Sequence, residues 1–132
     1  MEKQIEVVAA LLWQGDRFLL CQRPEQKARG MQWEFVGGKV EPGETKVDAL
    51  VRECREELGV TVAPRGALLT LLHEYPDLTI RLTLFDAVIV RGTPQPLEHC
   101  GLRWITLAES EDYDFCPADR ELLARLRADL SL

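Results

Sequence analysis

Residues 46–58 constrain the fold of this chain more than any other segment. Their apolar side chains recur at i, i+3 and i+4 spacing, which predicts an amphipathic helix. Glu53, Glu56 and Glu57 are separated by three and four positions on that helix, so their carboxylates project from one face as neighbours. The apolar stripe consists of Val47, Leu50, Val51, Cys54 and Leu58. One helix therefore has to pack against a hydrophobic core and also carry a concentration of like charge.

Two interpretations account for the three glutamates. Like charges at this spacing destabilise a helix, and on many helices such residues form a solvated face paired with arginines, here Arg52 and Arg55. The other interpretation is a metal site. Mg²⁺ prefers hard oxygen ligands and is usually held by carboxylates together with the phosphates of a substrate. The residues around the helix decide between the two interpretations.

The helix and the segment before it match a known motif without a gap. Gly38-Lys39-Val40-Glu41-Pro42-Gly43-Glu44 leads, seven residues later, to Arg52-Glu53-Cys54-Arg55-Glu56-Glu57-Leu58-Gly59-Val60. This pattern resembles the Nudix box, Gly-x5-Glu-x7-Arg-Glu-U-x-Glu-Glu-x-Gly-U, where U is aliphatic. Cys54 at an aliphatic position is the one departure, and a buried thiol packs there as a small hydrophobe. The chain thus resembles the MutT-like Nudix hydrolases, and strings such as Gln22-Arg23-Pro24 and Trp33-Glu34-Phe35 also resemble their CTP pyrophosphohydrolase branch.

The resemblance implies a fold. MutT-like Nudix hydrolases are α/β/α sandwiches, so we expect an α/β chain with a mixed central sheet and two main helices, in a single domain over residues 1–132. The remaining apolar segments suit that fold. They predict strands at 5–13 and 18–22 joined by a turn at Gly15-Asp16, a short strand at 33–36 that ends at Gly37-Gly38, hairpin strands at 67–75 and 79–90, a strand at 102–105, and a helix at 117–130.

The resemblance also implies the metal and the catalytic groups. The cofactor would be Mg²⁺, with Mn²⁺ able to substitute, and either Glu53 or Glu98 would accept the proton of the attacking water. Glu98 lies in a loop where it could equally be a solvated residue, but MutT-like enzymes often place a metal-binding glutamate there. Glu44 and Arg52 are expected to form an ion pair that orients the catalytic loop. The expected metal-binding residues are Gly37 or Gly38, Glu53, Glu56, Glu57 and Glu98.

Residues outside the motif would hold the nucleotide. Lys39 is expected to meet phosphate oxygens, and Arg23, Glu34, Tyr75 and Asp119 occupy the places that surround the base in MutT-like enzymes. Asp119 departs from the asparagine that is common in the 8-oxoguanine-selective members. An ionised aspartate only accepts hydrogen bonds, which suits the amino group of cytosine, unless burial protonates the carboxyl and restores a donor.

These features predict Mg²⁺-dependent hydrolysis of a nucleoside triphosphate to a nucleoside monophosphate and pyrophosphate. The expected substrates are 8-oxo-dGTP, cytidine-type triphosphates or both, in the sanitation of the nucleotide pool. The alternatives are a hydrolase of another nucleoside diphosphate derivative, such as a dinucleoside polyphosphate or ADP-ribose, and a non-catalytic nucleotide-binding domain. The complete set of motif carboxylates argues against a non-catalytic domain, and 132 residues leave little room for the insertions that larger substrates often require.

Composition argues against several other classes of protein. The net charge of −6 disfavours binding to a nucleic acid polymer. No apolar run approaches the roughly 20 residues that a membrane helix needs. The four cysteines form no CxxC pair and no regular framework, so we expect reduced thiols in a cytoplasmic protein. The expected partner is a small nucleotide, and the expected assembly is a monomer or a weak homodimer.

Overall fold

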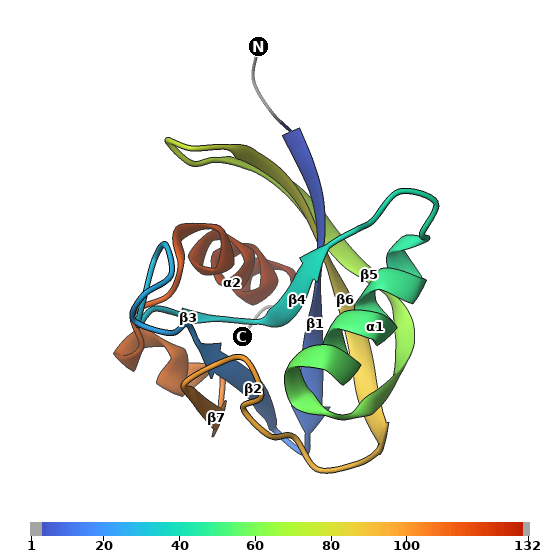
Figure 1. Cartoon of the computed structure of the whole chain (residues 1–132). Coiled ribbons are helices and arrows are strands. Elements are labelled where there is room, and N and C mark those ends of the chain that lie inside the picture. The colour runs from blue at the N-terminus through green and yellow to red at the C-terminus, as the bar shows by residue number, and fades with distance from the viewer. Residues whose placement is uncertain (1–3, 131–132) are drawn as a thin grey trace.

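The computed structural model describes residues 4–130, and Figure 1 shows how its elements are arranged. Strands make up more of residues 4–130 than helices do, with one α-helix between the fourth and fifth strands and another at the end of the described segment. The strands are β1 (Gln4–Gln14), β2 (Arg17–Gln22), β3 (Trp33–Glu34), β4 (Val36–Lys39), β5 (Thr61–Glu74), β6 (Thr79–Arg91) and β7 (Gly101–Ile105). The helices are α1 (Lys46–Leu58) and α2 (Pro117–Leu130), with a short 3₁₀ helix, η1, at Ala108–Asp112.

Strand β1 pairs with three other strands. It runs parallel to β6 over residues 4–12 and antiparallel to β4 over residues 7–10. Its last residues, Trp13 and Gln14, pair with β2 through a tight turn. Strand β2 in turn pairs antiparallel with β3 and β7. The resulting seven-stranded sheet is mixed, as predicted.

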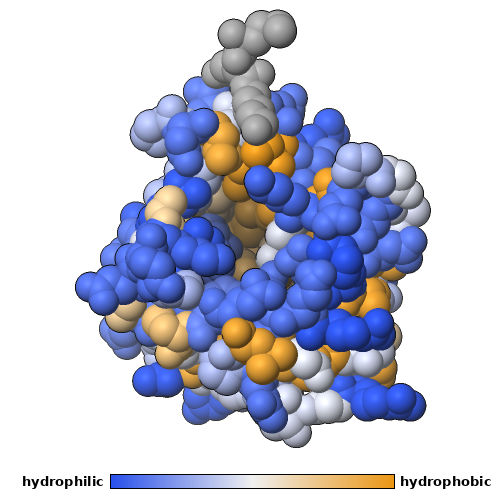
Figure 2. Space-filling view, viewed as in Figure 1, coloured by the Kyte–Doolittle hydropathy of each residue, from blue (hydrophilic) through white to orange (hydrophobic). Residues whose placement is uncertain are grey.

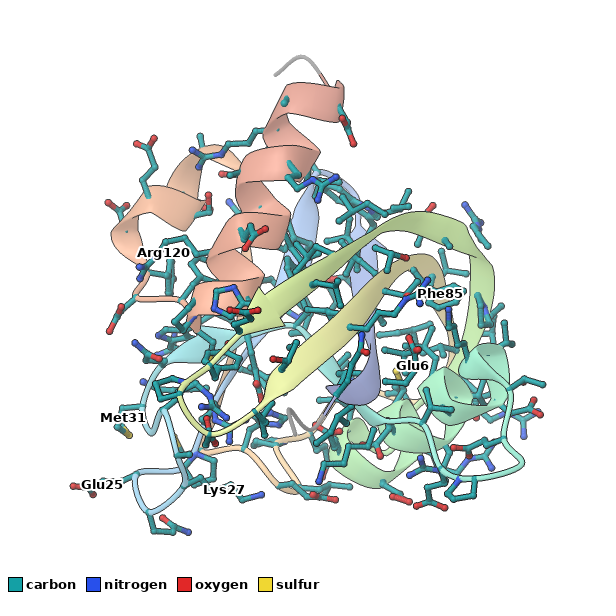
Figure 3. All side chains as sticks on the ribbon, turned by 90° about the horizontal axis from the view of Figure 1, so that it is seen from above. Glu6, Glu25, Lys27, Met31, Phe85 and Arg120 are labelled. Atoms are coloured by element: carbon teal, nitrogen blue, oxygen red, sulfur yellow. The ribbon has the colours of Figure 1, made fainter. Side chains whose placement is uncertain are left out.

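The two helices lie on opposite sides of this sheet (Figures 1 and 3). Successive side chains of a strand point to opposite faces, so β1 contributes to two hydrophobic cores. Val8 and Leu12 pack in the core that contains α1, whereas Ala9 and Leu11 pack in the core that contains α2. The predicted α/β/α sandwich is therefore confirmed. Neither of the α-helices in residues 4–130 is long and apolar enough to cross a membrane.

The boundaries of α1 agree with its local sequence. The hydroxyl of Thr45 accepts a hydrogen bond from the backbone N–H of Asp48 at 3.1 Å, which satisfies a donor that the first helical turn leaves unpaired. At the other end, the N–H of Gly59 donates to the carbonyl of Arg55 at 3.0 Å. The helix predicted at 46–58 is confirmed, and its position fixes the direction in which the three glutamates point.

The strand predicted over residues 33–36 is wrong in its extent. The structure divides it at Phe35, whose backbone N–H donates to the carboxylate of Asp119 at 3.0 Å instead of to a neighbouring strand. Strand β3 before this point pairs with β2, and strand β4 after it pairs with β1. The strand does not end at Gly37 and Gly38, because β4 passes through both glycines.

Strand β5 begins at Thr61, earlier than the predicted residue 67. The register with β6 shifts near Pro64 and Gly66, two residues that would usually mark a loop. β5 lies at the edge of the sheet, where proline and bulged glycine are tolerated because one side of the strand needs no partner. The edge position therefore explains why the strand continues through residues that normally break one.

Candidate active site

Two glycines of β4 allow this strand to pack closely against both α1 and β1. A β-carbon on Gly38 would overlap the carboxylate of Glu53, and a β-carbon on Gly37 would overlap the backbone of Val8 in β1. Any larger residue at either position would force the strand away. Strand β4 therefore runs along the carboxylate-bearing face of α1.

The carbonyl of Gly37 faces away from β1. Hydrogen-bonded positions alternate along an antiparallel pair, and Val40 donates to β1 at 3.0 Å, so Gly38 is the next bonded position. Gly37 and Lys39 lie between bonded positions and direct their carbonyls to the opposite side. The Lys39 carbonyl accepts a hydrogen bond from Arg52 of α1 at 3.0 Å. Of the two glycine carbonyls considered from the sequence, the geometry favours Gly37 as the one that faces the glutamates.

Arg52 ties the motif glutamates together. Its Nε and Nη2 atoms donate to the two oxygens of Glu44 at 2.8 and 3.0 Å. Its Nη1 atom donates to Glu53 at 2.7 Å and to Glu56 at 3.2 Å. The hydrogen bonds with Glu44 are the main reason why the pKa of Arg52 is raised, and they also lower the pKa of Glu44. The guanidinium therefore stays charged and holds the loop before α1 against the helix.

Three of the predicted glutamates line one cavity of about 440 Å³, which we call the carboxylate cavity. Glu57 is nearly buried, with 8% of its side chain exposed, and its pKa is raised far above the usual glutamate range by burial and then by neighbouring Glu53. Glu56 lies outside the lining, with 48% of its side chain exposed. The predicted residues in the lining are Arg23, Gly37, Gly38, Lys39, Glu53, Glu57 and Glu98.

The carboxylate cavity fits a hard divalent cation. Its ligand atoms are carboxylate oxygens, with the Gly37 carbonyl beside them, and this is the donor set that Mg²⁺ and Mn²⁺ prefer. Buried carboxylates close to one another are unfavourable as anions unless a cation lies among them. Arg52 does not fill that role for Glu57, because its hydrogen bonds are with other glutamates and with the Lys39 carbonyl.

Backbone hydrogen bonds hold the loop before β7 against α1 and β2. The N–H of Leu97 donates to the carbonyl of Glu57 at 3.1 Å, and the N–H of Cys100 donates to the carbonyl of Gln22 at 3.0 Å. Glu98 lies between these two attachments and therefore lines the carboxylate cavity, although it is distant from the other motif residues in sequence.

A second cavity of about 240 Å³ adjoins the first, and we call it the β1 cavity because β1 and β6 form its apolar floor. Figure 2 shows a hollow on this face with hydrophobic residues inside it and hydrophilic residues around it. Four residues line both cavities: Arg23, Gly37, Gly38 and Lys39. The residues predicted to bind the nucleotide all lie in the β1 cavity lining: Arg23, Glu34, Lys39, Tyr75 and Asp119.

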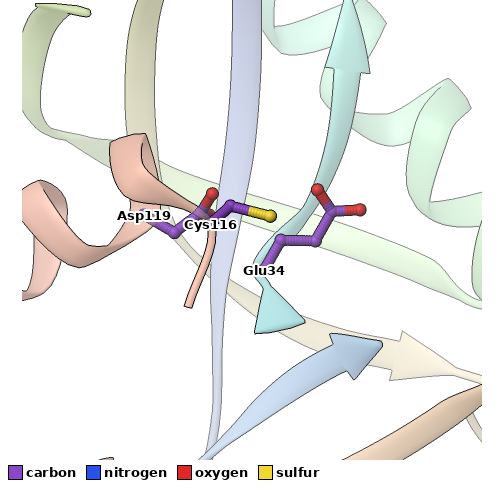
Figure 4. A group of neighbouring side chains, drawn as sticks. All are labelled: Glu34, Cys116 and Asp119. Atoms are coloured by element: carbon purple, nitrogen blue, oxygen red, sulfur yellow. The ribbon is translucent and has the colours of Figure 1, made fainter. Parts of the chain in front are cut away.

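Polar groups from two elements converge on one wall of the β1 cavity (Figure 4). Ligand atoms of Glu34, Cys116 and Asp119 all lie within 4.8 Å of one another, which would suit a metal ion. Glu34 already accepts a hydrogen bond from Arg23 at 3.0 Å, however, and Asp119 accepts one from Phe35 at 3.0 Å. Burial raises the pKa of the Cys116 thiol, which makes it a poor nucleophile. Burial, with the charge of Glu34, raises the pKa of Asp119 to about 8.

Tyr75 closes the β1 cavity from the β5–β6 hairpin. Its hydroxyl accepts a hydrogen bond from the N–H of Ala118 at 3.0 Å, which anchors the hairpin to the start of α2. The guanidinium of Arg29 lies over its ring, 4.1 Å from the ring centre. Arg29 comes from the loop between β2 and β3, so the hairpin and this loop meet at the cavity.

Comparison with known proteins identifies the family. Residues 3–126 match the family model for the NUDIX domain. The chain belongs to the Nudix family. One Nudix relative, the CTP pyrophosphohydrolase of Escherichia coli (strain K12), is 40% identical over 126 residues, covering 96% of this chain and 93% of that protein. The putative 8-oxo-dGTP diphosphatase 2 of Mycobacterium tuberculosis (strain ATCC 25618 / H37Rv) is 36% identical, covering 95% of this chain and 89% of that protein.

Solved structures agree with this assignment. The solution structure of the E. coli ORF135 protein superposes with a TM-score of 0.83 at 40% identity, covering 96% of this chain and 91% of that chain. The crystal structure of the MutT protein from Methanosarcina mazei Go1 has a TM-score of 0.87 at 26% identity, covering 99% and 98%. The prediction of a MutT-like Nudix hydrolase, an enzyme that acts on phosphorus anhydrides, is confirmed.

Some polar residues of this Nudix site, among them Arg29, His99 and Cys116, were not predicted. Arg29 and Cys116 line the β1 cavity, and His99 contacts Glu34 from behind the cavity wall at 2.9 Å. The available signals were weak. His99 follows Glu98 directly, and Cys116 precedes the segment that contains Asp119, but neither has a spacing that predicts a contact.

Proposed function

We propose that this Nudix hydrolase converts nucleoside triphosphates to nucleoside monophosphates and pyrophosphate, with cytidine-type triphosphates, 8-oxo-dGTP or both as substrates. The observation that carries the proposal is the junction of the two cavities at Gly37, Gly38 and Lys39. A nucleotide laid across this junction puts its base over the apolar floor of the β1 cavity and its phosphates against α1. The names of the two relatives, a CTP pyrophosphohydrolase and a putative 8-oxo-dGTP diphosphatase, support these substrate classes.

The proposed metal site is formed by Glu53, Glu56, Glu57 and Glu98 with the Gly37 carbonyl. A divalent metal held there, Mg²⁺ or Mn²⁺, supplies positive charge that offsets the phosphate oxygens and the charge that develops on the leaving group. Lys39 lies at the junction of the cavities and has no ion pair with any other residue in the range 4–130, so its ammonium group is available to phosphate oxygens. Arg52 holds Glu53 and Glu56 in place through its hydrogen bonds to their carboxylates.

Glu98 is the better candidate for the group that takes the proton from the attacking water. The Glu53 carboxylate accepts a hydrogen bond of 2.7 Å from Arg52, which fixes its orientation and occupies one of its oxygens. Among the described residues, the Glu98 carboxylate has no hydrogen-bond partner and lies in the same cavity. We therefore assign proton acceptance to Glu98 and a positioning and metal-binding role to Glu53.

The carboxyl groups on the wall of the β1 cavity suggest how the base is chosen. An ionised Asp119 accepts a hydrogen bond from an exocyclic amino group such as that of cytosine. A protonated Asp119 both donates and accepts, as an asparagine amide does, and this form suits 8-oxoguanine. Burial raises the pKa of Asp119 to about 8, close to neutral pH, so both forms are available to a ligand, which supports the proposal of two substrate classes in one cavity.

A substrate panel tests the proposed function. CTP, dCTP, 5-methyl-dCTP, 8-oxo-dGTP, dATP, dGTP, ADP-ribose and a dinucleoside polyphosphate are incubated with enzyme and Mg²⁺, and products are separated by chromatography with pyrophosphate detection. We expect monophosphate and pyrophosphate from the cytidine or 8-oxoguanine compounds. Glu57→Gln should lower kcat by about 100-fold or more, because several kcal/mol of transition-state stabilisation depend on the metal site.

Two outcomes would contradict the proposal. Equal turnover of dATP and dGTP without preference for either expected class would refute the assigned specificity. Turnover of ADP-ribose or the dinucleotide alone would assign the site to another Nudix substrate. Glu111→Gln serves as the control, because Glu111 belongs to η1 and its side chain is 75% exposed, so its loss should leave kcat unchanged.

We also propose that the enzyme acts in the cytoplasm as a monomer or a weak homodimer and removes damaged or unwanted nucleotides from the pool. Cys21, Cys54, Cys100 and Cys116 are all free, as is typical of proteins from reducing compartments. Sedimentation at micromolar concentration tests the oligomeric state, and the mutation rate of a strain that lacks the protein tests the role in sanitation.

A further inference from the structure

His99 is buried between the two cavities. It follows Glu98 in the loop before β7, and only 4% of its side chain is exposed. Its Nε2 atom lies 2.9 Å from an oxygen of Glu34, on the wall of the β1 cavity, and 3.6 Å from an oxygen of Glu57, in the carboxylate cavity. Its Nδ1 atom is buried and has no hydrogen-bond partner in the described part of the chain. The imidazole therefore directs all its polar contacts at two carboxyl groups, one in each cavity.

This arrangement is costly for a residue that only fills space. A buried polar atom without a partner destabilises the folded protein relative to an apolar atom of the same shape. The unpartnered atom is Nδ1, and the compensating hydrogen bond is the one between Nε2 and Glu34, with a Glu57 oxygen 3.6 Å from the same Nε2 atom. Glu34 already accepts a hydrogen bond from Arg23, so its second oxygen is an acceptor for an N–H at Nε2 at 2.9 Å, whereas the Glu57 oxygen at 3.6 Å lies just beyond hydrogen-bond distance of the same atom. The burial of His99 is therefore explained by its contacts with the two glutamates.

The two glutamates depend on His99 to different degrees. Glu34 is held from two sides, because its other oxygen accepts a hydrogen bond from Arg23 at 3.0 Å. Glu57 has no arginine or lysine partner among the described residues, since Arg52 pairs with Glu44 and Glu53 instead. Among the described residues, His99 is thus the basic side chain within 4 Å of a Glu57 oxygen, and its Nε2 atom lies close to Glu57 and to the fixed Glu34 at once.

We propose that His99 is a positioning residue that couples base recognition in the β1 cavity to divalent-metal binding in the carboxylate cavity. This proposal rests on the proposed function, since it assigns the base to one cavity and the metal to the other. A base that contacts Glu34 restricts the carboxylate that His99 holds, and the same imidazole orients Glu57. A nucleotide with the correct base therefore improves the metal site, and removal of the Nε2 donor separates the two events.

A matched pair of variants isolates the donor. His99→Gln keeps an amide N–H close to the position of Nε2, whereas His99→Met keeps an unbranched side chain of similar length and removes the donor. Binding of Mn²⁺ to the free protein is measured by electron paramagnetic resonance, and kcat/KM is measured for CTP, 8-oxo-dGTP and dATP. We expect His99→Met to weaken Mn²⁺ binding by about tenfold to 100-fold, as loss of a residue that orients a metal ligand commonly does.

The same variant should also lose base discrimination. In His99→Met the kcat/KM ratio of the preferred base over dATP is expected to fall by about tenfold, whereas His99→Gln should keep both properties within about threefold of the wild type. A merely structural residue would lower the melting temperature in both variants without moving Mn²⁺ affinity or the ratio. Equal losses in the two variants, or wild-type Mn²⁺ binding by His99→Met, would overturn the proposal.

Two further arms keep the test decisive. Where His99→Met does not fold, Glu34→Met tests the link from its other end, because Glu34 lies in the β1 cavity and yet its loss should weaken Mn²⁺ binding by about tenfold. Unchanged Mn²⁺ binding in that variant would overturn the coupling. Where the wild type cleaves no nucleoside triphosphate, the proposed function fails, and the Mn²⁺ measurements on the same variants still decide whether His99 positions Glu57.

Discussion

Asp119 sets the hydrogen-bonding character of the β1 cavity. One of its oxygens is occupied by the Phe35 N–H at 3.0 Å, so the other is left to meet a ligand. Burial is the main cause of its raised pKa of about 8, and the nearby charge of Glu34 adds to it. The carboxyl is consequently protonated below that pH, where it donates and accepts, and ionised above it, where it only accepts.

Substrate preference should therefore change with pH. We expect the kcat/KM ratio of 8-oxo-dGTP over CTP to rise as the pH falls from about 9 to about 6.5, because protonation gives Asp119 the donor that 8-oxoguanine needs. The Asp119→Asn variant has donor and acceptor at every pH, so its ratio should be high and flat. Steady-state kinetics with both nucleotides in one buffer series provides the measurement. A slope that persists in Asp119→Asn would assign the titration to another group.

The same carboxyl should affect stability. Its pKa is raised from 3.8 to about 8 on folding, so the folded state binds more protons than the unfolded state between these values. The free energy of unfolding is then lost progressively as pH rises from about 4 to about 8. Asp119→Asn removes this titration. The free energy of unfolding of the variant minus that of wild type should therefore rise by at least about 1 kcal/mol from the low end of the pH window to the high end. The free energy of unfolding of both proteins is measured with urea at about pH 5 and about pH 8, near the two ends of the window. A difference between the two proteins that is the same at both pH values would contradict the prediction.

At the scale of elements, Arg52 joins α1, β4 and the loop between them. It donates to Glu44 in the loop, to Glu53 on the helix and to the carbonyl of Lys39 on the strand. Lysine keeps the charge but offers no planar array of donors that could reach all three. Arg52→Lys should lower kcat/KM by about tenfold to 100-fold and stability by roughly 1–3 kcal/mol. Kinetics and urea unfolding measure both, with Arg55→Lys as the control because Arg55 is exposed on the same helix. Equal effects of the two substitutions would contradict the role of Arg52.

The elements also show which parts of the molecule could be predicted from sequence. Helix α1 was predictable because its signals are local: an apolar stripe, a capping Thr45 and a terminal Gly59. The break between β3 and β4 was not, because it depends on a hydrogen bond between Phe35 and Asp119, which are distant in sequence. His99 was missed for the same reason, since its contacts with Glu34 and Glu57 arise only when three separate segments meet. The motif thus located the carboxylate cavity, and the wall of the β1 cavity required the folded chain.

At the scale of the whole molecule, strand β1 belongs to both hydrophobic cores. The core on the α1 side contains Leu50, and the core on the α2 side contains Leu122, and both leucines are fully buried. Alternate residues of one strand contribute to the two cores, so neither core can separate without exposing the face of β1 that it covers. We therefore expect the two layers to fold as one cooperative unit, which the prediction of a single domain also requires.

Truncating a leucine in each layer tests this cooperativity. Leu50→Ala and Leu122→Ala should each lower the free energy of unfolding by about 2–5 kcal/mol, because each leaves a cavity in a packed core. In both variants, urea unfolding followed by far-UV circular dichroism and by tryptophan fluorescence should show a single transition with one midpoint. Loss of the α1 layer in Leu50→Ala, with the α2 layer still folded, would appear as two separated midpoints and would show that the sandwich consists of two independent units. A single midpoint in both variants means that helix α1 cannot loosen without loss of the wall that holds Asp119, so the two cavities persist or disappear together.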